Sequence, residues 1–309
     1  MEKVFTNANW SAHAKTYNSI FSKLTGRWAT DSLQVAHHEI QKKLQQHEAK
    51  NSTFHFLDVG CGPGVLSFEF ARRYLTAPTD IRITASDLSD GMLQLVSDAL
   101  KDDSTLSPFA PKFTTLQCDG MVLEEVTDNS VDAIGSNFGL GIFPNRAKGW
   151  ATAHRVLKED GLLFVTAWSD KSSQMVWLDT ITDMFNAAEG EGTLKYPSLG
   201  FGTDREKTIK ELQAVGFKDV KSYCSTHTIV FENPKAFLAA NMSLPTTAKF
   251  LEKLTKEQME RTLVELIEKD AQQNFYQEGD ILKSDSANPF AEGGPRLISF
   301  TGFIMTARK

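Results

Sequence analysis

Short apolar runs alternate with longer segments of helical periodicity between residues 51 and 170. Most of the short runs are rich in Val, Ile, Leu or Phe, a composition that predicts buried strands. The longer segments place apolar residues three or four positions apart, as amphipathic helices do. The predicted strands are residues 56–59, 81–86, 113–118, 130–137 and 162–167.

Strands that alternate with helices at this spacing predict an α/β fold with a Rossmann-like, doubly wound and mostly parallel sheet. Both faces of such a sheet are covered by helices. One of the helices, at residues 145–157, is expected to end within the segment Lys158-Glu-Asp-Gly161, because glycine commonly stops helices. We interpret residues 51–170 as the core of the domain.

The two ends of the chain depart from this rhythm. Residues 1–50 are expected to form an N-terminal helical lid with helices at 10–24 and 31–46. Residues 171–309 are expected to complete a seven-stranded sheet with two further strands that flank a helical insertion. A long insertion of this kind is typical of a lid or an acceptor cap. The elements predicted after residue 170 are helices 175–188 and 204–215, strands 219–231 and 297–306, and the helical cap at about 234–290.

Composition narrows the possible partners. The formal charge of −6 argues against broad nucleic-acid binding, which leaves a basic footprint. No apolar run approaches the roughly 18 residues that a membrane span requires, and the start of the chain has no apolar segment of the secretory type. Cys61, Cys118 and Cys224 are isolated in the sequence, so we expect neither a disulfide framework nor a metal site. We expect a cytoplasmic location.

A glycine turn follows the first predicted strand. Gly60, Gly62 and Gly64 separate that strand from a helix that begins near Val65. Glycine can adopt positive φ and lets a ligand approach the backbone closely. The first free N–H groups of the helix also point toward such a ligand. The sequence therefore predicts a ligand site at this turn.

Two cofactor classes compete for the turn. A dinucleotide fingerprint G-x-G-x-x-G would place its third glycine at position 65, which is valine here. The acidic residues at the ends of the next strands favour another ligand. Asp87 can accept hydrogen bonds from both hydroxyls of a ribose, and Asp119 can accept one from an adenine amine. No lysine of the phosphate-binding loop type is present, so the pattern favours a ligand with ribose and adenine but no phosphate.

These segments resemble the motifs of class I S-adenosylmethionine-dependent methyltransferases. They occur in the order that is typical of that family, over about 110 residues. The segments that carry the resemblance are Leu57-Asp-Val-Gly-Cys-Gly-Pro-Gly64, Ser86-Asp-Leu-Ser-Asp-Gly-Met-Leu93, Gln117-Cys-Asp-Gly120, Val131-Asp-Ala-Ile-Gly-Ser-Asn-Phe138 and Arg155-Val-Leu-Lys-Glu-Asp-Gly-Leu-Leu163.

Smaller pieces extend the likeness in two directions. The run from Val4-Phe5 to Tyr17-Asn-Ser-Ile is similar to the segment before the core of ubiquinone and menaquinone C-methyltransferases. Three segments resemble fungal natural-product methyltransferases, including dithiol S-methyltransferases of secondary metabolism. They are Lys23-Leu-Thr-Gly26, Asp87-Leu-Ser-Asp-Gly-Met-Leu93 and Phe138-Gly-Leu-Gly-Ile-Phe-Pro144. The Arg-Asn pair of the quinone enzymes is absent, and Leu140-Gly141 stands in its neighbourhood.

The resemblance implies S-adenosylmethionine as cofactor and S-adenosylhomocysteine as product. It assigns the methionyl end to the glycine turn, the cofactor ammonium to Asp58, the ribose to Asp87 and the adenine edge to Asp119. Tyr17 is expected to close over the cofactor. The residues that the resemblance assigns to the cofactor are Tyr17, Asp58, Gly60, Gly62, Asp87, Leu88, Met92, Asp119, Gly120, Met121, Asn137 and Phe138.

The acceptor side is less defined by the sequence. His13 lies four positions before Tyr17, so both side chains can face the same site, and His13 is the candidate catalytic base. Candidate walls for an apolar acceptor are Trp10, Trp168, Phe201 and Phe275.

The predicted function is methyl transfer to a small-molecule acceptor through S, N or O. The alternatives are a quinone-type C-methyltransferase, a cofactor-binding subunit without catalysis, and a nicotinamide oxidoreductase. No nucleic-acid partner is expected, because no basic groove or base-flipping motif is apparent in the sequence.

Overall fold

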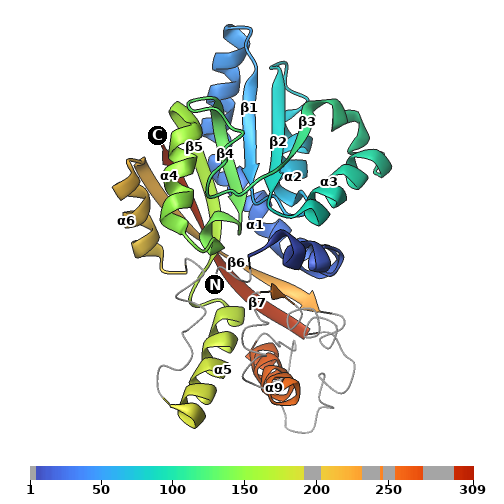
Figure 1. Ribbon diagram of the computed structural model, residues 1–309, viewed down its shortest axis with the longest axis vertical. Coiled ribbons are helices and arrows are strands. Elements are labelled where there is room, and N and C mark those ends of the chain that lie inside the picture. Colours follow the sequence, from blue (N-terminus) through green and yellow to red (C-terminus); the bar gives the residue numbers. More distant parts are fainter. Residues whose placement is uncertain (1–4, 191–202, 232–243, 246–254, 274–295) are drawn as a thin grey trace, which may run out of the picture. The chain divides into compact units, whose positions relative to one another are not determined.

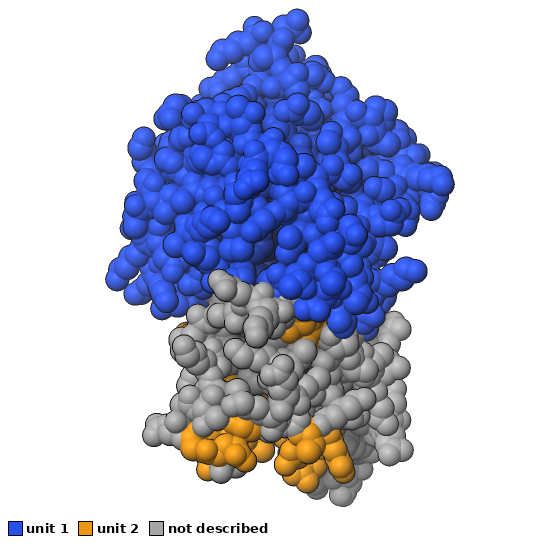
Figure 2. All heavy atoms as spheres, in the orientation of Figure 1, with its two compact units in different colours: residues 1–168, 200–225, 302–309 blue, residues 169–199, 226–301 orange. Residues whose placement is uncertain are grey.

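The computed structural model describes residues 5–190, 203–231, 244–245, 255–273 and 296–309. It divides into two compact units, which Figure 2 distinguishes by colour. The first unit comprises residues 1–168, 200–225 and 302–309, and the second comprises residues 169–199 and 226–301. Most of the predicted cap at 234–290 lies outside the described residues, as do Phe201 and Phe275.

A seven-stranded sheet in the order β3-β2-β1-β4-β5-β7-β6 forms the centre of the fold (Figure 1). The five strands β3, β2, β1, β4 and β5 pair with one another in parallel, whereas β7 pairs with β5 in antiparallel register. The prediction of a mostly parallel, seven-stranded sheet is therefore confirmed. The strands are β1 (Phe54–Val59), β2 (Ile81–Asp87), β3 (Phe113–Gln117), β4 (Val131–Asn137), β5 (Leu157–Trp168), β6 (Lys218–Phe231) and β7 (Arg296–Arg308).

Alternate residues of the strands supply two separate apolar layers, because successive side chains of a strand point to opposite faces. Phe54 and Phe56 of β1 pack with α1 (Asn7–Ala49) and α2 (Val65–Tyr74). Leu57 and Val59 pack instead with α4 (Arg146–Val156) and α6 (Arg205–Val215). The helix α3 (Asp90–Asp102) joins α2 on the first face through Ala85 of β2. Both faces of the sheet thus carry helices, as predicted.

The connection from β3 to β4 contains turns and no helix across residues 118–130. The face of β2 and β3 that points to the α4 side is therefore less covered than the rest of the sheet. Arg82 of β2 and Thr114 of β3 are exposed there. The helical layer on this side of the sheet thus has a gap over its edge strands.

The N-terminal region is one helix rather than the two that the sequence predicted. Helix α1 runs without interruption for 43 residues, from Asn7 to Ala49. Gly26 weakens the helical pattern between the two predicted segments, since glycine lowers helix propensity. Trp28 and Ala29, however, are fully buried against the rest of the domain. Tertiary packing of these side chains therefore overrides the local preference.

The helix before β5 agrees with the predicted residues 145–157 to within one residue at each end, but the role predicted for Gly161 was wrong. Helix α4 ends at Val156, and β5 begins at once with Leu157. Residues 158–161 form an irregularity within the strand, because Val131 pairs with Leu157 but Ala133 pairs with Leu162. Asp160 has a φ of 61°, and Gly161 is the next residue of the strand. Gly161 thus serves a bulge in β5 and does not stop a helix.

The second unit contains α5 (Ser173–Glu189) and α9 (Lys256–Gln273). Trp177 of α5 is buried and donates a hydrogen bond of 2.8 Å from Nε1 to Oδ2 of Asp270 on α9. Ser173 at the start of α5 donates a 2.8 Å hydrogen bond to the carbonyl of Ser299 in β7. Within the described part of the chain, no helix has the length and apolar character of a membrane span.

Candidate cofactor-binding site

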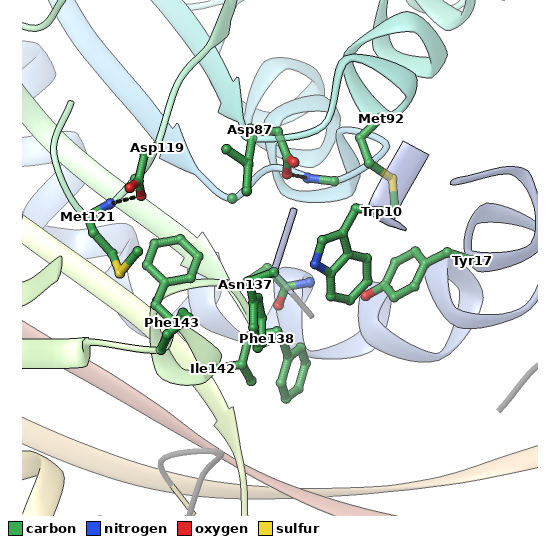
Figure 3. A pocket seen from close by; sticks show the side chains of 17 residues that line it. Trp10, Tyr17, Asp87, Met92, Asp119, Met121, Asn137, Phe138, Ile142 and Phe143 are labelled. Atoms are coloured by element: carbon green, nitrogen blue, oxygen red, sulfur yellow. Dashed lines mark hydrogen bonds between the residues drawn. The ribbon is translucent and has the colours of Figure 1, made fainter. Parts of the chain in front are cut away.

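A cavity of about 200 Å³ opens at the carboxyl ends of β1, β2, β3 and β4 in the first unit (Figure 3). Ligands of open α/β sheets bind at this edge. The cavity brings together every residue that the resemblance assigned to the cofactor, except Asp58. Its lining consists of Phe5, Trp10, Tyr17, Gly60, Gly62, Asp87, Leu88, Met92, Asp119, Gly120, Met121, Asn137, Phe138, Gly139, Ile142, Phe143 and Pro144.

The glycine turn has the backbone conformation that its sequence predicted. Gly60, Gly62 and Gly64 all have positive φ, at 67°, 53° and 89°. A Cβ atom on Gly62 would meet no protein atom within 4 Å. Because Gly62 also lines the cavity, this free space is available to a ligand beside the backbone. The turn therefore fits a group that must approach the main chain closely.

Replacing Gly62 or Gly64 with alanine should destabilise the protein to different extents. Gly62→Ala should cost only about 1 kcal/mol of stability, from the positive φ alone. Gly64→Ala should cost about 3 kcal/mol, because its Cβ would lie 2.9 Å from the ring of Phe68 and 3.1 Å from Val96. Urea unfolding measures both values. Equal losses in the two variants would contradict the difference in free space.

Asp87 connects the end of β2 to the glycine turn. Its Oδ2 accepts a 2.8 Å hydrogen bond from the N–H of Gly62, and its Oδ1 accepts one of 2.9 Å from the N–H of Ser89. Desolvation raises the pKa of this carboxyl, and the backbone N–H groups of Ser89 and Gly62 oppose that shift. Each carboxylate oxygen retains a further lone pair for hydroxyl donors. The N–H groups of Gly62 and Ser89 thus fix the orientation of the Asp87 carboxyl at the cavity wall.

Asp119 and the segment after it form a second polar corner. Oδ1 of Asp119 accepts a 2.8 Å hydrogen bond from the N–H of Met121, as the dashed line in Figure 3 marks. A Cβ atom on Gly120 would lie only 2.6 Å from the ring of Phe143. Glycine is therefore required here for close packing of the chain against that ring.

Arg155 of α4 holds the loop that carries Asp119. Its NH2 group donates hydrogen bonds of 2.8 and 3.0 Å to the carbonyls of Val122 and Leu123. Its NH1 group donates one of 3.2 Å to the carbonyl of Val126 and also contacts Asp128. One guanidinium thus satisfies three backbone acceptors of a segment that has no helix of its own.

Asn137 and Phe138 end β4 in a hydrogen-bonded corner. The hydroxyl of Thr166 donates a 2.9 Å hydrogen bond to Oδ1 of Asn137 and accepts one of 2.9 Å from the N–H of Phe138. Nδ2 of Asn137 donates to the carbonyl of Thr25 on α1, at 3.2 Å. Phe138 has a φ of 58°, which is unusual for a bulky residue. The corner fixes this strained conformation and connects β4 to α1.

Aromatic side chains from α1 and from the loop after β4 give the cavity an apolar wall. Trp10 and Tyr17 of α1 lie edge to face, with ring centroids 6.2 Å apart, and Figure 3 shows them beside one another. Phe143 lines the cavity as well. Burial raises the pKa of Tyr17 to about 12, so its hydroxyl stays protonated at neutral pH.

The first turns of α1 are tied to the start of α3. The hydroxyl of Ser11 donates a 2.6 Å hydrogen bond to Asp90 and accepts one of 3.1 Å from the N–H of Gly91. Oδ1 of Asn7 accepts a 3.0 Å hydrogen bond from the N–H of Asp90. A Cβ atom on Gly91 would lie 2.9 Å from the Cα of Ser11, so the two helices touch at this point. These contacts place Trp10 and Tyr17 over the cavity.

Two of the predicted site residues lie away from the cavity wall. Asp58 is fully buried, and its Oδ2 accepts a 2.6 Å hydrogen bond from Ser67. Asp58 shares a face of β1 with Phe54 and Phe56, so its carboxyl lies beneath the turn rather than in the cavity. Nδ1 of His13 is 2.7 Å from the carbonyl oxygen of Asn9, and His13 does not line the cavity.

Some lining residues were not assigned a role from the sequence. Gly139, Ile142, Phe143 and Pro144 follow β4 and include a short 3-10 helix at Leu140–Ile142. They belong to a segment that carries the family resemblance, but no local signal indicates that this loop folds back toward Gly120. Trp168, expected as an acceptor wall, is buried and stacks on Phe138 at 4.1 Å between ring centroids.

Comparison with known proteins agrees with this geometry. Residues 57–165 match a family model described as a methyltransferase domain. A ubiquinone/menaquinone biosynthesis C-methyltransferase UbiE of Citrifermentans bemidjiense is 30% identical over 188 residues, which cover 56% of this chain and 74% of that relative. The UbiE of Rickettsia felis is 27% identical over 160 residues, covering 51% of this chain and 62% of the relative. The structure of YcgJ from Bacillus subtilis shares the fold, with a TM-score of 0.50 and 12% identity, and covers 88% of this chain and 98% of that one.

The chain belongs to the class I S-adenosylmethionine-dependent methyltransferases, and S-adenosylmethionine is the cofactor of this family. Its match to the Rickettsia felis relative spans 62% of that protein's length.

Proposed function

We propose that this protein transfers the methyl group of S-adenosylmethionine to a small-molecule acceptor. The observation that carries the proposal is a cavity that joins a positive-φ glycine turn, two carboxylates at strand ends and an aromatic wall. A glycine turn without a phosphate-binding lysine suits an adenosyl ligand that has an amino-acid end. Membership of the family supports the same conclusion.

The binding roles follow the order of the strands. The turn at Gly60 and Gly62 would receive the methionyl end, and Asp87 would accept both ribose hydroxyls. Asp119 would accept from the adenine amine. Leu88 and Met92 would line the adenine with apolar side chains, and the backbone of Gly120 and Met121 would lie beside its edge. Asn137 and Phe138 would lie beside the reacting sulfur.

Bound S-adenosylmethionine supplies an activated methyl group, so the protein mainly has to orient the acceptor and exclude water. The aromatic residues Trp10, Tyr17 and Phe143 would provide that enclosure. No His, Lys or Cys side chain is among the described residues that line the cavity. Tyr17 remains protonated because of its raised pKa, so its hydroxyl can donate a hydrogen bond but does not serve as a base. An acceptor that needs little help from a base, such as a thiol, an amine or an acidic phenol, fits this lining.

Quinone-type C-methylation is the second candidate. It is favoured by the names of the relatives, which are ubiquinone/menaquinone biosynthesis C-methyltransferases. The segment Leu140-Gly141 differs from the Arg-Asn pair of those enzymes and favours the first candidate. A cytoplasmic location and a role in secondary metabolism belong to the proposal too, and rest on the isolated cysteines and on the likeness to natural-product enzymes.

Calorimetry with S-adenosylmethionine and S-adenosylhomocysteine tests the cofactor. Both should bind, and absence of binding by either at millimolar concentration would contradict the proposal. Cell extracts incubated with a deuterated-methyl cofactor should then yield a labelled small molecule by mass spectrometry. A labelled quinone precursor would select the second candidate. Cofactor binding without any labelled product would instead indicate a non-catalytic subunit.

A further inference from the structure

A second cavity, of about 470 Å³, lies at the opposite edge of the sheet from the cofactor site. It is formed where β1, β2, β3 and β4 begin, by residues that precede or open these strands. The family's cofactor binds at the carboxyl edge, so this cavity has no part in the site described above. Its lining consists of Thr53, His55, Asp80, Ile81, Arg82, Pro111, Lys112, Thr114, Ser130 and Lys158.

The cavity exists because the helical layer has a gap. His55 pairs in register with Arg82, and Thr84 pairs with Thr114, so these side chains share one face of the sheet. A helix between β3 and β4 would cover that face, but residues 118–130 form only turns. Parallel strands with both faces covered are usually continuous apolar runs. The polar residues on this face therefore mark a surface that is built for water or for a polar ligand.

The charges of the lining are mainly positive, although the chain as a whole carries a net charge of −6. Nζ of Lys112 is 2.6 Å from Asp80, and Nζ of Lys158 is 2.8 Å from both carboxylate oxygens of Asp132. Arg82 differs from these two lysines. Within the described ranges its guanidinium contacts an imidazole, so its positive charge is not neutralised by a carboxylate.

The imidazole of His55 fixes the position of Arg82. NH2 of Arg82 lies 3.0 Å from Nδ1 of His55, and Nε2 of His55 lies 2.9 Å from the hydroxyl oxygen of Thr84. Arginine can only donate, so Nδ1 accepts and the ring proton is on Nε2. Burial, and then the charge of Arg82, lower the pKa of His55 to about 4, which keeps the ring neutral. The backbone N–H of His55 is held in turn by Asp132, at 2.9 Å.

We propose that this cavity binds a phosphate group of a small phosphorylated molecule, with Arg82 as the main contact. A guanidinium presents two parallel N–H donors that match the oxygens of a phosphate. Thr114 lines the same cavity and supplies a hydroxyl donor, whereas Lys112 is already paired with Asp80. A neutral, buried histidine orients the guanidinium without cancelling its charge, so the full attraction remains for the anion.

Inorganic phosphate is the probe for this site, titrated calorimetrically into the full chain at constant ionic strength. Wild-type protein should bind it saturably, and Arg82→Gln should weaken the binding about tenfold, for one lost charge-assisted contact. Arg82→Lys keeps the charge but loses the paired donors, so its affinity should lie between the two. Lys148→Gln on α4, an exposed lysine outside the cavity, should bind phosphate as the wild type does.

The phosphate site should be independent of the cofactor site. Binding of S-adenosylhomocysteine should be the same in wild type and Arg82→Gln, which shows that the variant is folded and that the two sites are separate. Absence of saturable phosphate binding, or equal binding by wild type and Arg82→Gln, would overturn the inference. Glycerol 3-phosphate and vesicles containing phosphatidic acid then distinguish a soluble phosphate ester from a lipid headgroup.

Discussion

Replacing Asp87 with alanine is expected to weaken the binding of S-adenosylhomocysteine about 100-fold, the effect of losing two charge-assisted hydrogen bonds. The carboxyl of Asp87 lines the cavity and already receives the N–H groups of Gly62 and Ser89. Its removal would take away the proposed ribose contact and also the acceptor of the Gly62 N–H in the glycine turn. Isothermal titration of the variant measures the loss directly.

The controls for this prediction use the same region of the chain. Asp98→Ala changes an exposed carboxylate of α3 that contacts Gln94, and it should leave the affinity unchanged. Asp87→Asn retains one acceptor oxygen and should lie between the wild type and Asp87→Ala. Wild-type affinity in Asp87→Ala would show that the ribose is held elsewhere.

Asp58→Asn is expected to stabilise the protein at pH 8, by up to about 4 kcal/mol for a pKa shift of about three units. Burial, and then the charge of Asp87, raise the pKa of Asp58 to about 7 from an ordinary value of 3.8, although Ser67 donates a hydrogen bond that opposes the shift. Oδ1 of Asp58 has no hydrogen-bond partner among the described residues. An amide in this position has no charge to bury.

The pH dependence identifies the cause. Between pH 4 and 7 the carboxyl ionises in the unfolded chain but stays protonated in the folded one, so the wild type loses stability as the pH rises through this range. Above about pH 7 the loss is complete. The advantage of Asp58→Asn should therefore grow from pH 4 to 7 and then remain constant in urea unfolding experiments.

A carboxylate with the opposite shift provides the control. Hydrogen bonds from Thr105 lower the pKa of Asp103, so Asp103→Asn should lose stability above the ordinary pKa of aspartate instead of gaining it. If the stability difference between Asp58→Asn and the wild type did not change between pH 4 and 7, a buried and costly charge at this position would be ruled out.

Local patterns in the sequence were sufficient to place the glycine turn and the aspartates at or just after the ends of β2 and β3, Asp87 and Asp119, at one edge of the sheet. Positive φ is a property of glycine itself, and a parallel strand delivers its last residue to the carboxyl edge of the sheet. Gly62, Asp87 and Asp119 could therefore be placed without knowledge of their distant neighbours.

Other parts of the site depend on contacts that no local pattern encodes. The spacing of His13 and Tyr17 puts both on one side of α1 but does not fix which way that side turns, and Tyr17 alone of the two reaches the cavity. Alternation along β1 places Asp58 on the same face as Phe54 and Phe56 and so indicates a buried carboxyl. The family resemblance assigned Asp58 to the cofactor instead. Phe143 reaches Gly120 through a loop that begins with the strained residue Phe138.

Helix α1 is synthesised before any strand that it covers. Its buried side chains include Phe21, Leu24, Trp28 and Leu33, and Trp28 donates its indole hydrogen bond to the carbonyl of Ser225, 197 residues further along the chain. Most of the apolar face of α1 packs with residues up to Phe164, but the contact with Ser225 forms only when nearly three quarters of the protein has been made. Until these partners exist the helix exposes apolar surface, and such surfaces favour aggregation and chaperone binding. The helix that is translated first is thus among the last to acquire all its partners.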